Sequence, residues 1–516
     1  MIEATEPATP FLNGQPLVLN GQPLSLIEIF TVANGHATDE LHPAALERMR
    51  ASRQIVDDIV AREETVYGIN TGFGKLSDIH IPAAELRQLQ RNLVRSHAAG
   101  VGEPLSREEA RAMLLLRANV LAKGFSGVRP LVAELLIAML NAGIHPVIPS
   151  RGSVGASGDL APLAHIALAL IGEGDVISDG SCMHAAEAFA KSGLHPIDLE
   201  AKEGLALLNG TQAMAAVGGL AIHRALRAAA LFDLSGAMSL EALRGTPVAF
   251  DPRIQAVRPH LGQSKAAAHL LALLNDSEIR ESHRTGDSRI QDAYCLRCMP
   301  QVHGAVRDAL AHAAAVIEIE TGSATDNPLV FAETGEILSG GNFHGAPLAF
   351  VLDYAAIALT DMISIAERRI DRLINPDINE GLPAFLSDNP GVSSGLMIVH
   401  VTAAALLNEA KVLAHPASVD SVPTSGGKED HVSMGMTSAL KLKQIVENAE
   451  LVLGIELIAA AQGLEYRRPL RAAREVENAY MVVRRWVPRL AEDRSLSAEI
   501  ELLAETIREG AFDEWV

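Results

Sequence analysis

The stretch Gly152–Asp159 reads Gly-Ser-Val-Gly-Ala-Ser-Gly-Asp and has the clearest capacity for unusual chemistry. In a very tight turn the amide nitrogen of Gly158 can attack the carbonyl carbon of Ala156, because glycine has no Cβ to block closure. Loss of water would close a five-membered imidazolone, and loss of a second water from Ser157 would leave an exocyclic methylene. That methylene is a strong electrophile of a kind that no ordinary side chain provides.

The same stretch also fits a flexible loop or an anion-binding turn before a helix. It is not a Walker loop, because no Gly-Lys-Ser/Thr follows, and its glycine spacing differs from the dinucleotide-binding fingerprint. On this motif alone both interpretations stay open.

Further candidates for chemistry lie on distant segments. Tyr67, in the glycine-rich Thr65–Gly74, is either a turn residue or a base, if its surroundings lower a phenol pKa of about 10. Asn209 lies in an apolar setting and would be a buried polar group that needs partners. Tyr294 and Arg297 are three residues apart and share a face if helical. The arginine suits either bidentate capture of a carboxylate or a surface ion pair.

Helices must position these residues. The chain of 516 residues is 48% hydrophobic and only 4% aromatic, with alanine and leucine supplying most of the apolar content. Alternating β-branched runs are scarce, so we expect an all-α, mainly helical fold with little β structure and no large sheet. Apolar spacing, caps and breakers predict helices near 43–62, from 82, 106–124, 160–170, 302–320, 346–374, 394–413 and 435–462.

The chain divides by pattern into a smaller, loop-rich N-terminal portion, residues 1–215, and a long-helix bundle, residues 216–516. The first portion carries the Ala156 turn. A short repeat at 12–17 and 19–24 has the turn chemistry of a hairpin. The bundle helices are apolar over wide arcs, which predicts faces that meet other subunits.

Charge and cysteine usage exclude several classes of protein. A net charge of −20 disfavours binding to nucleic acid or to an anionic membrane. The three cysteines do not form a disulfide framework, and Cys295-x-x-Cys298 has no second pair for zinc, so no metal is expected. No signal-peptide pattern and no apolar run of roughly 18 residues is found, since Asp353 and Asp361 interrupt the best candidate. A cytoplasmic location follows as an expectation.

These motifs, in this order, resemble the histidine/phenylalanine ammonia-lyase family from about residue 22 to about residue 510. Ser339–His344 and Thr424–Met434 match that family as well. The resemblance implies that Ala156-Ser157-Gly158 forms a 4-methylideneimidazole-5-one group autocatalytically, with no external cofactor. Because the candidate residues lie on distant segments and the helices are too apolar for a monomer, we expect a homotetramer of dihedral symmetry whose active sites draw residues from more than one subunit.

Roles for single residues follow from the resemblance. Tyr67 would take the β-proton, Asn209 would hold the ring oxygen and the substrate amine, and Arg297 would bind the carboxylate. The pocket would be lined by Gln291, Tyr294 and Phe343.

Two residues bear on the substrate. His97 and Glu429 resemble the histidine-specific branch, in which the glutamate bonds an imidazole N–H. Taken without the family, they are a helix-end histidine and a helix-start carboxylate. The reaction implied is elimination of ammonia from L-histidine to give trans-urocanate. Two departures from the family pattern change the charge nearby: Lys428, where many bacterial relatives have glutamine, and Ala346, where a glutamate often occurs.

Rival functions remain. A phenylalanine or tyrosine ammonia-lyase, or an aromatic 2,3-aminomutase, would use the same group. The helical fumarase/argininosuccinate lyase superfamily fits the composition, but its signature is absent. A non-enzymatic helical scaffold predicts decay of the Ala156–Gly158 triplet or of Tyr67, and both are intact.

Overall fold

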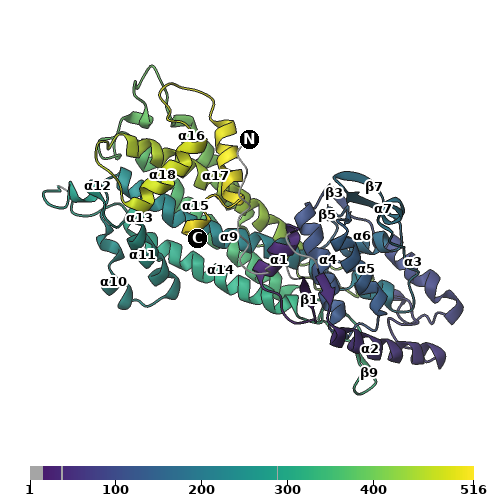
Figure 1. Cartoon of the computed structure of the whole chain (residues 1–516). Coiled ribbons are helices and arrows are strands. Elements are labelled where there is room, and N and C mark those ends of the chain that lie inside the picture. Colours follow the sequence, from purple (N-terminus) through teal and green to yellow (C-terminus); the bar gives the residue numbers. More distant parts are fainter. Residues whose placement is uncertain (1–15, 36–38, 288) are drawn as a thin grey trace. The chain divides into compact units, whose positions relative to one another are not determined.

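The computed structural model describes residues 16–35, 39–287 and 289–516 and is mainly helical, which confirms the predicted fold class (Figure 1). The chain forms two compact units, each built from three segments. Unit 1 comprises Met1–His223, Ala314–Asp353 and Pro416–Leu440, and unit 2 comprises Arg224–Ala313, Tyr354–His415 and Lys441–Val516. A domain boundary near residue 215 stays a prediction.

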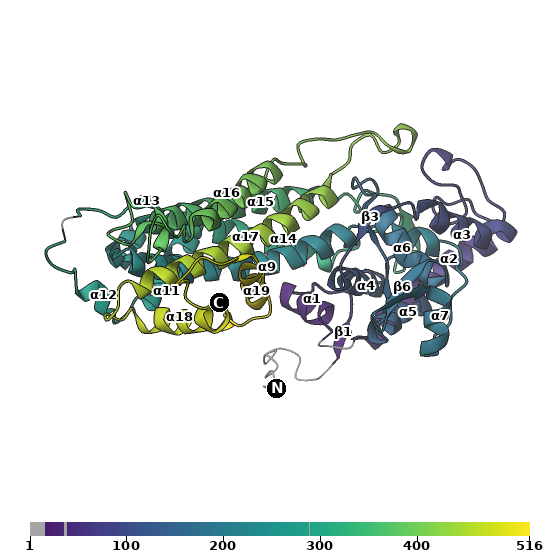
Figure 2. The same ribbon diagram turned by 90° about the horizontal axis from the view of Figure 1, so that it is seen from above.

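Unit 1 is built around α4, whose side chains are almost all buried. This helix begins at the predicted capping box of Ser106 and Glu109, and Figures 1 and 2 show it beside α1 and α5. The helices that lie wholly in unit 1 are α1 (Leu26–Ala33), α2 (Pro43–Ala61), α3 (Leu86–His97), α4 (Arg107–Ala122), α5 (Pro130–Asn141), α6 (Leu160–Leu170), α7 (Ala185–Ser192) and α8 (Glu203–Leu208).

The strands are short and form small sheets, as expected. The pairs are β1 (Leu17–Leu19) with β2 (Asp39–Leu41), β3 (Val101–Pro104) with β5 (Pro149–Arg151), and β8 (Leu329–Phe331) with β9 (Glu336–Leu338), while β4 (His145–Pro146), β6 (Asp175–Ser178) and β7 (Ser181–His184) form one three-stranded sheet.

The prediction of an N-terminal hairpin is wrong for the residues that the structure describes, from residue 16 onward. Residues 12–15 of the first repeat lie outside the described residues. Leu17–Leu19 pairs in parallel with Asp39–Leu41, so its partner is not the second repeat. The bend after Leu19 is closed by the Asn20 side chain, which accepts from the Gln22 N–H, and the chain then enters α1 instead of returning as a strand.

Unit 2 is helical and contains α10 (Pro252–Ala256), α11 (Leu261–Leu273), α12 (Glu278–Glu281), α13 (Tyr294–Arg297), α16 (Met397–Leu413), α18 (Arg474–Trp486) and α19 (Ser497–Arg508). Four of the five unit boundaries fall within the four longest helices, and the fifth, at His415, follows α16: the four helices are α9 (Gln212–Ala242), α14 (Met299–Thr321), α15 (Ala346–Ile374) and α17 (Gly435–Glu465). Short 3₁₀ turns occur at η1 (Gly74–Leu76), η2 (Ala83–Glu85), η3 (Pro247–Phe250), η4 (Ala384–Leu386), η5 (Ser425–Gly427) and η6 (Asp513–Trp515).

Gly463 does not end α17, contrary to the prediction. A Cβ at Gly463 would lie 3.0 Å from the Cβ of Ala242, so this glycine serves a close helix contact. Helix α9 was not predicted, because its apolar residues cover nearly its whole circumference and give little periodicity.

Two helices, α9 and α15, are long and apolar enough to span a membrane by length and composition, which the sequence analysis did not anticipate. Their most apolar windows are 78% and 61% buried inside the protein, as in the core helices of a soluble protein.

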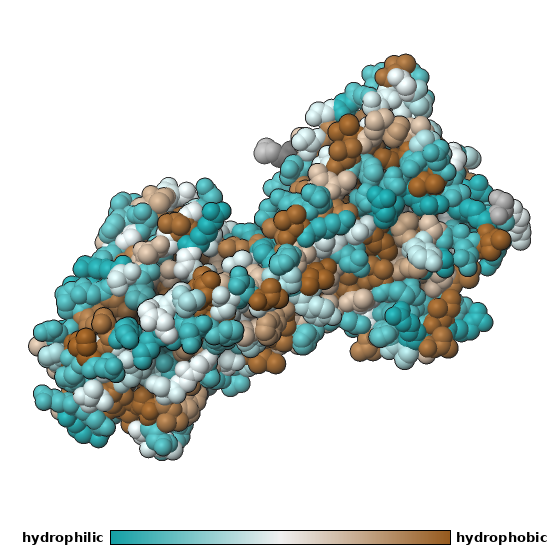
Figure 3. All heavy atoms as spheres, turned by 180° about the vertical axis from the view of Figure 1, so that it is seen from behind, coloured by the Kyte–Doolittle hydropathy of each residue, from teal (hydrophilic) through white to brown (hydrophobic). Residues whose placement is uncertain are grey.

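Some apolar side chains remain at the surface. Along α15, Phe350, Tyr354 and Ile357 are exposed at helical spacing. On the face seen in Figure 3, hydrophobic residues reach the surface at several places among hydrophilic ones.

Candidate active site

A cavity of about 580 Å³ in unit 1 brings together side chains from six separate stretches of the chain. Six of the predicted site residues line it: Tyr67, His97, Ser157, Asn209, Phe343 and Glu429. Ala156 and Gly158 flank Ser157 in the turn that reaches the cavity.

The Ala156–Gly158 turn is tight and left-handed. Ser157 has φ +52° and Gly158 has φ +78°, a region that side chains other than glycine rarely adopt. A Cβ at Gly158 would lie 2.1 Å from the carbonyl oxygen of Gly210, so only glycine fits here. The Asp159 N–H donates to that same oxygen at 2.7 Å. This fixed, strained turn suits the attack of the Gly158 nitrogen on Ala156 that the sequence suggested.

Asp159, directly after the turn, is a buried acid that was not among the predicted site residues. Its carboxylate accepts from Ser153 Oγ and from the Met214 N–H, each at 2.8 Å. Burial raises the pKa of Asp159 to about 6, against the opposing effect of these hydrogen bonds. The available signal was its type, since a carboxylate directly before the apolar helix α6 needs internal partners.

Glu429 faces the turn. Its Oε1 accepts from Ser157 Oγ at 2.6 Å, and its Oε2 accepts from Thr424 Oγ1 at 2.8 Å and from Ser425 Oγ at 2.5 Å. Although burial raises the pKa of Glu429, these hydroxyls and the nearby His97 lower it below its usual value overall. The carboxylate is therefore held ionised beside Ser157.

His97 is the last residue of α3. Its Nδ1 lies 2.8 Å from the Leu93 carbonyl oxygen, as in an ordinary helix-end histidine. The ring nevertheless lines the cavity, and Nε2 is its remaining polar atom.

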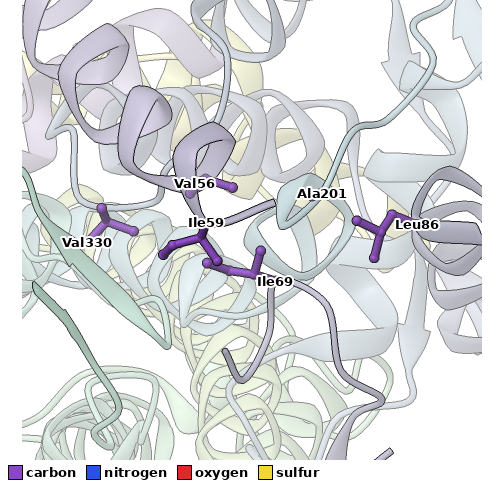
Figure 4. Close-up of a cluster of buried hydrophobic side chains, with 6 residues drawn as sticks. All are labelled: Val56, Ile59, Ile69, Leu86, Ala201 and Val330. Carbon is purple, nitrogen blue, oxygen red and sulfur yellow. The ribbon is translucent and has the colours of Figure 1, made fainter. Parts of the chain in front are cut away.

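The loop that carries Tyr67 is held by a buried hydrophobic cluster. Ile69 is fully buried in a cluster that includes Val56 and Ile59 of α2 and Ala201 before α8 (Figure 4). Gly68 has φ +78°, and a Cβ there would lie 2.7 Å from Pro328 Cδ. The chain directly after Tyr67 is therefore held by packing.

The condition attached to Tyr67 as a base is not met within one chain. Burial raises the pKa of the Tyr67 phenol, the backbone of Gly74 lowers it in part, and the charges of Glu429 and Asp326 raise it further. These surroundings do not lower the pKa, because the phenol is buried and both nearby charges are negative.

Asn209 is only 3% exposed and ends α8, as a buried polar group with partners. Its Nδ2 donates to Asp326 Oδ1 at 3.3 Å and to the Asn327 carbonyl oxygen at 3.0 Å. Its Oδ1 has no hydrogen-bond partner among the described residues. The atom left for a ligand is thus an acceptor, which suits a substrate amine better than a ring oxygen.

The other three predicted residues lie in unit 2, and the cavity lining found among the described residues includes none of them: Gln291, Tyr294 and Arg297. The expectation that Tyr294 and Arg297 share a face is confirmed, since the guanidinium carbon lies 4.4 Å from the ring centroid. Arg297 Nε also donates to the Asp292 carbonyl oxygen at 3.0 Å, and Tyr294 is 70% exposed.

Of the two departures, Lys428 lines the cavity beside Glu429, and Ala346 begins α15. Other lining residues were missed as individual candidates, although some lie in quoted motifs: Lys75, Asn327, Ser339 and Ser425.

Comparison with known proteins identifies the family. Residues 24–485 match the family model described as aromatic amino acid lyase. The chain belongs to the aromatic amino acid lyase family. This confirms the resemblance drawn from the motifs. The protein is therefore a carbon–nitrogen lyase, and the cavity at the Ala156–Gly158 turn agrees with that activity.

Relatives within this family cover nearly the whole chain. A histidine ammonia-lyase from Anaeromyxobacter dehalogenans is 55% identical over 507 residues, which cover 97% of this chain and 100% of the relative. The crystal structure of histidine ammonia-lyase from Trypanosoma cruzi is 43% identical, with a TM-score of 0.89 and coverage of 97% and 95%. Tyrosine aminomutase from Streptomyces globisporus is 39% identical, with a TM-score of 0.92 and coverage of 97% and 98%.

Proposed function

We propose that this protein eliminates ammonia from L-histidine to give trans-urocanate, using a 4-methylideneimidazole-5-one group formed from Ala156, Ser157 and Gly158. The left-handed turn and its contact with Gly210 support ring closure at this place. When present, the group supplies an electrophile that makes the amino nitrogen a better leaving group. No external cofactor is required.

The observation that carries the choice of histidine is the contact between Ser157 Oγ and Glu429 Oε1 at 2.6 Å. Formation of the group consumes the Ser157 hydroxyl, so Glu429 Oε1 loses its hydrogen-bond donor. Glu429 Oε2 keeps its two donors, Thr424 and Ser425. An imidazole N–H can replace the lost donor, whereas a phenyl ring would leave a partly buried carboxylate oxygen unpaired. Histidine therefore suits the mature pocket better than phenylalanine.

The remaining roles follow from what each side chain can donate or accept. Asn209 Oδ1 would accept from the substrate amine, and Arg297 would bind the carboxylate in a bidentate manner. Tyr67 would take the β-proton, aided by Gln291, Tyr294 and Phe343, which would line and support the substrate pocket. Because the surroundings raise the pKa of Tyr67, proton abstraction needs a cationic neighbour, and the substrate ammonium or Arg297 would be one.

We further propose a cytoplasmic homotetramer whose sites combine residues of more than one subunit. The exposed stripe on α15 and the exposed Tyr294 support this arrangement. Tyr67→Phe and Arg297→Ala, each inactive alone, should regain part of the activity when dissociated and reassembled together. An active monomer in sedimentation would contradict the assembly.

The test of the function is incubation with L-histidine, L-phenylalanine and L-tyrosine, following the ultraviolet absorbance of each enoate and assaying for β-amino acids. Glu429→Gln should lower turnover of histidine by at least about 10²-fold. The matched control Glu336→Gln, at an exposed carboxylate of β9, should leave it unchanged. A β-amino acid as the main product would identify an aminomutase instead.

A further inference from the structure

Every polar atom of Asn209 except one, counting backbone and side chain, has a hydrogen-bond partner. Its backbone N–H donates to the Leu205 carbonyl oxygen at 3.0 Å, and its carbonyl oxygen accepts from Arg117 Nη1 at 2.9 Å. Its Nδ2 has two acceptors, Asp326 Oδ1 and the Asn327 carbonyl oxygen. Within the described part of the chain, only Oδ1 is left without a partner.

The acceptor Asp326 is itself fixed by a buried cation. Lys202 Nζ lies 2.8 Å from Asp326 Oδ2, and the exposed fractions of the two side chains are 0% and 1%. The Asn327 N–H donates to Asp326 Oδ1 at 2.7 Å. Lys202 directly precedes α8 and Asn209 directly follows it, so both ends of this short helix converge on one carboxylate.

Reversal of the Asn209 amide would be costly. It would turn Oδ1 toward the Asp326 carboxylate and the Asn327 carbonyl, so that acceptors would face each other without hydrogens between them. The ionised carboxylate thus determines which end of the Asn209 amide is left without a protein partner among the residues described. A leucine-sized apolar residue at position 326 would fill the space but would not make this choice.

We propose that Asp326 is a positioning residue that orients the Asn209 amide so that Oδ1 accepts a hydrogen bond from the amine of the amino acid substrate, with Lys202 holding Asp326 in place. This rests on the proposed function only in that the substrate carries an amine. It assigns work to two buried residues that lie outside the cavity lining.

The sharpest test exchanges the two partners while keeping the charge. Asp326→Asn leaves Lys202 without its counterion and lets the Asn209 amide rotate, so kcat/KM should fall by about 10²-fold. Asn209→Asp puts two carboxylates together, so its kcat/KM should fall at least as far. The double variant N209D/D326N restores a donor at one of the two positions and an acceptor at the other, keeps one negative charge in this group of residues, and leaves one carboxylate oxygen of residue 209 to accept from the substrate amine. Its kcat/KM should exceed that of either single variant by at least about tenfold.

Binding provides a readout that does not depend on turnover. By calorimetry, D326N should weaken L-histidinol, which has the amine, and should leave 3-(imidazol-4-yl)propionate, which lacks it, nearly unchanged. The matched control is Asp39→Asn, a buried aspartate of the same unit that is absent from the lining found among the described residues, and it should alter neither ligand. Intact mass should show the loss of two waters in all variants, which separates misorientation from failure to form the group.

Independent losses that simply add in N209D/D326N, or equal weakening of both ligands by D326N, would overturn the proposal. If D326N fails to fold, K202M/D326N removes both charges together and should fold with the same loss of amine binding. The amine is common to all three candidate amino acids, so whichever one the wild type converts serves as substrate. Conversion of phenylalanine instead of histidine would therefore refute the substrate assignment and leave the positioning of Asn209 testable.

Discussion

Two buried clusters of charged side chains, one in each unit, are satisfied to different degrees. The site cluster in unit 1 consists of Arg117, Lys202 and Asp326, and the scaffold cluster in unit 2 consists of Asp233, His303, Arg307, Arg369 and Glu456. In the scaffold cluster every carboxylate oxygen has at least one donor. Glu456, for example, accepts from Arg369 on both oxygens and also from Ser235 and Ser239.

The site cluster leaves polar atoms unpaired. Nε and Nη2 of Arg117, and Oδ1 of Asn209, which adjoins the cluster through Arg117 and Asp326, lack partners within the described ranges. The scaffold cluster has one such atom, Nε of Arg307, on a side chain that is 21% exposed. Each unpaired buried polar group costs about 1–3 kcal/mol. Of these atoms, only Asn209 Oδ1 belongs to a residue that lines the cavity, and under the proposed function the substrate amine would pair it, whereas the carboxylates of the scaffold cluster are already paired within the protein and serve stability.

The strongest contrast is expected from Ser157→Ala. Without the hydroxyl no exocyclic methylene can form, so turnover should fall by at least about 10⁴-fold, while the denaturant midpoint stays near that of the wild type. The wild-type mass should be two waters below the sequence mass, and the variant should lack the loss from residue 157. A full unmodified mass in active wild-type protein would contradict the mechanism.

Tyr67→Phe removes the proposed proton acceptor and keeps the ring, so kcat should fall by about 10²–10⁴-fold with little change in stability. The pKa of Tyr67 is raised, and the active form of a base is the deprotonated one. The wild-type rate should therefore increase with pH through the neutral and alkaline range. Near-normal turnover by the variant, or the same pH profile, would mean that another group takes the proton.

The sequence predicted most helices and the chemistry of the turn, because apolar spacing, capping boxes and a glycine triplet are local signals. It also selected six residues that line one cavity. It did not reveal Lys202 or Asp326, since these meet only when residues 124 positions apart fold together. Nor did it determine the direction of the Tyr67 pKa shift, for the same reason. The sign of its neighbours' charges is a property of the folded site.

A substitution in the scaffold cluster should have the opposite effect to Ser157→Ala, since it should lower stability and leave turnover unchanged. Asp233→Asn leaves His303 and Arg307 without their counterion, so the free energy of unfolding should fall by about 3–5 kcal/mol, while kcat per folded molecule is retained. Burial raises the pKa of Asp233, but the hydrogen bonds from its histidine partners lower it by more. The net pKa is therefore well below the usual value. Its stabilisation is thus present above pH 4 and is lost as the pH falls below that value. Denaturant midpoints between pH 3 and 7 measure both effects, and loss of kcat without loss of stability would reverse the assignment.

A smaller effect of opposite sign is expected at Asp39. Burial raises its pKa to about 7, against the nearby charge of Arg111. The folded state therefore binds the proton more tightly, and stability is lost as the pH rises from about 4 to about 7. Asp39→Asn should raise the free energy of unfolding at pH 8 by roughly 1–3 kcal/mol and leave it unchanged at pH 4. Equal midpoints at pH 8 would show that water or Arg111 already compensates this charge.

The central claim is that the cavity beside the site cluster is built for an amino acid whose ring donates a hydrogen bond to Glu429. The most direct measurement is the ratio of kcat/KM for L-histidine and L-phenylalanine in the wild-type enzyme, with urocanate and cinnamate followed by their ultraviolet absorbance. A pocket that leaves a carboxylate oxygen unpaired with phenylalanine should favour histidine by up to about 10⁴-fold. Comparable values for the two amino acids would contradict the account of the pocket and leave only membership of the lyase family.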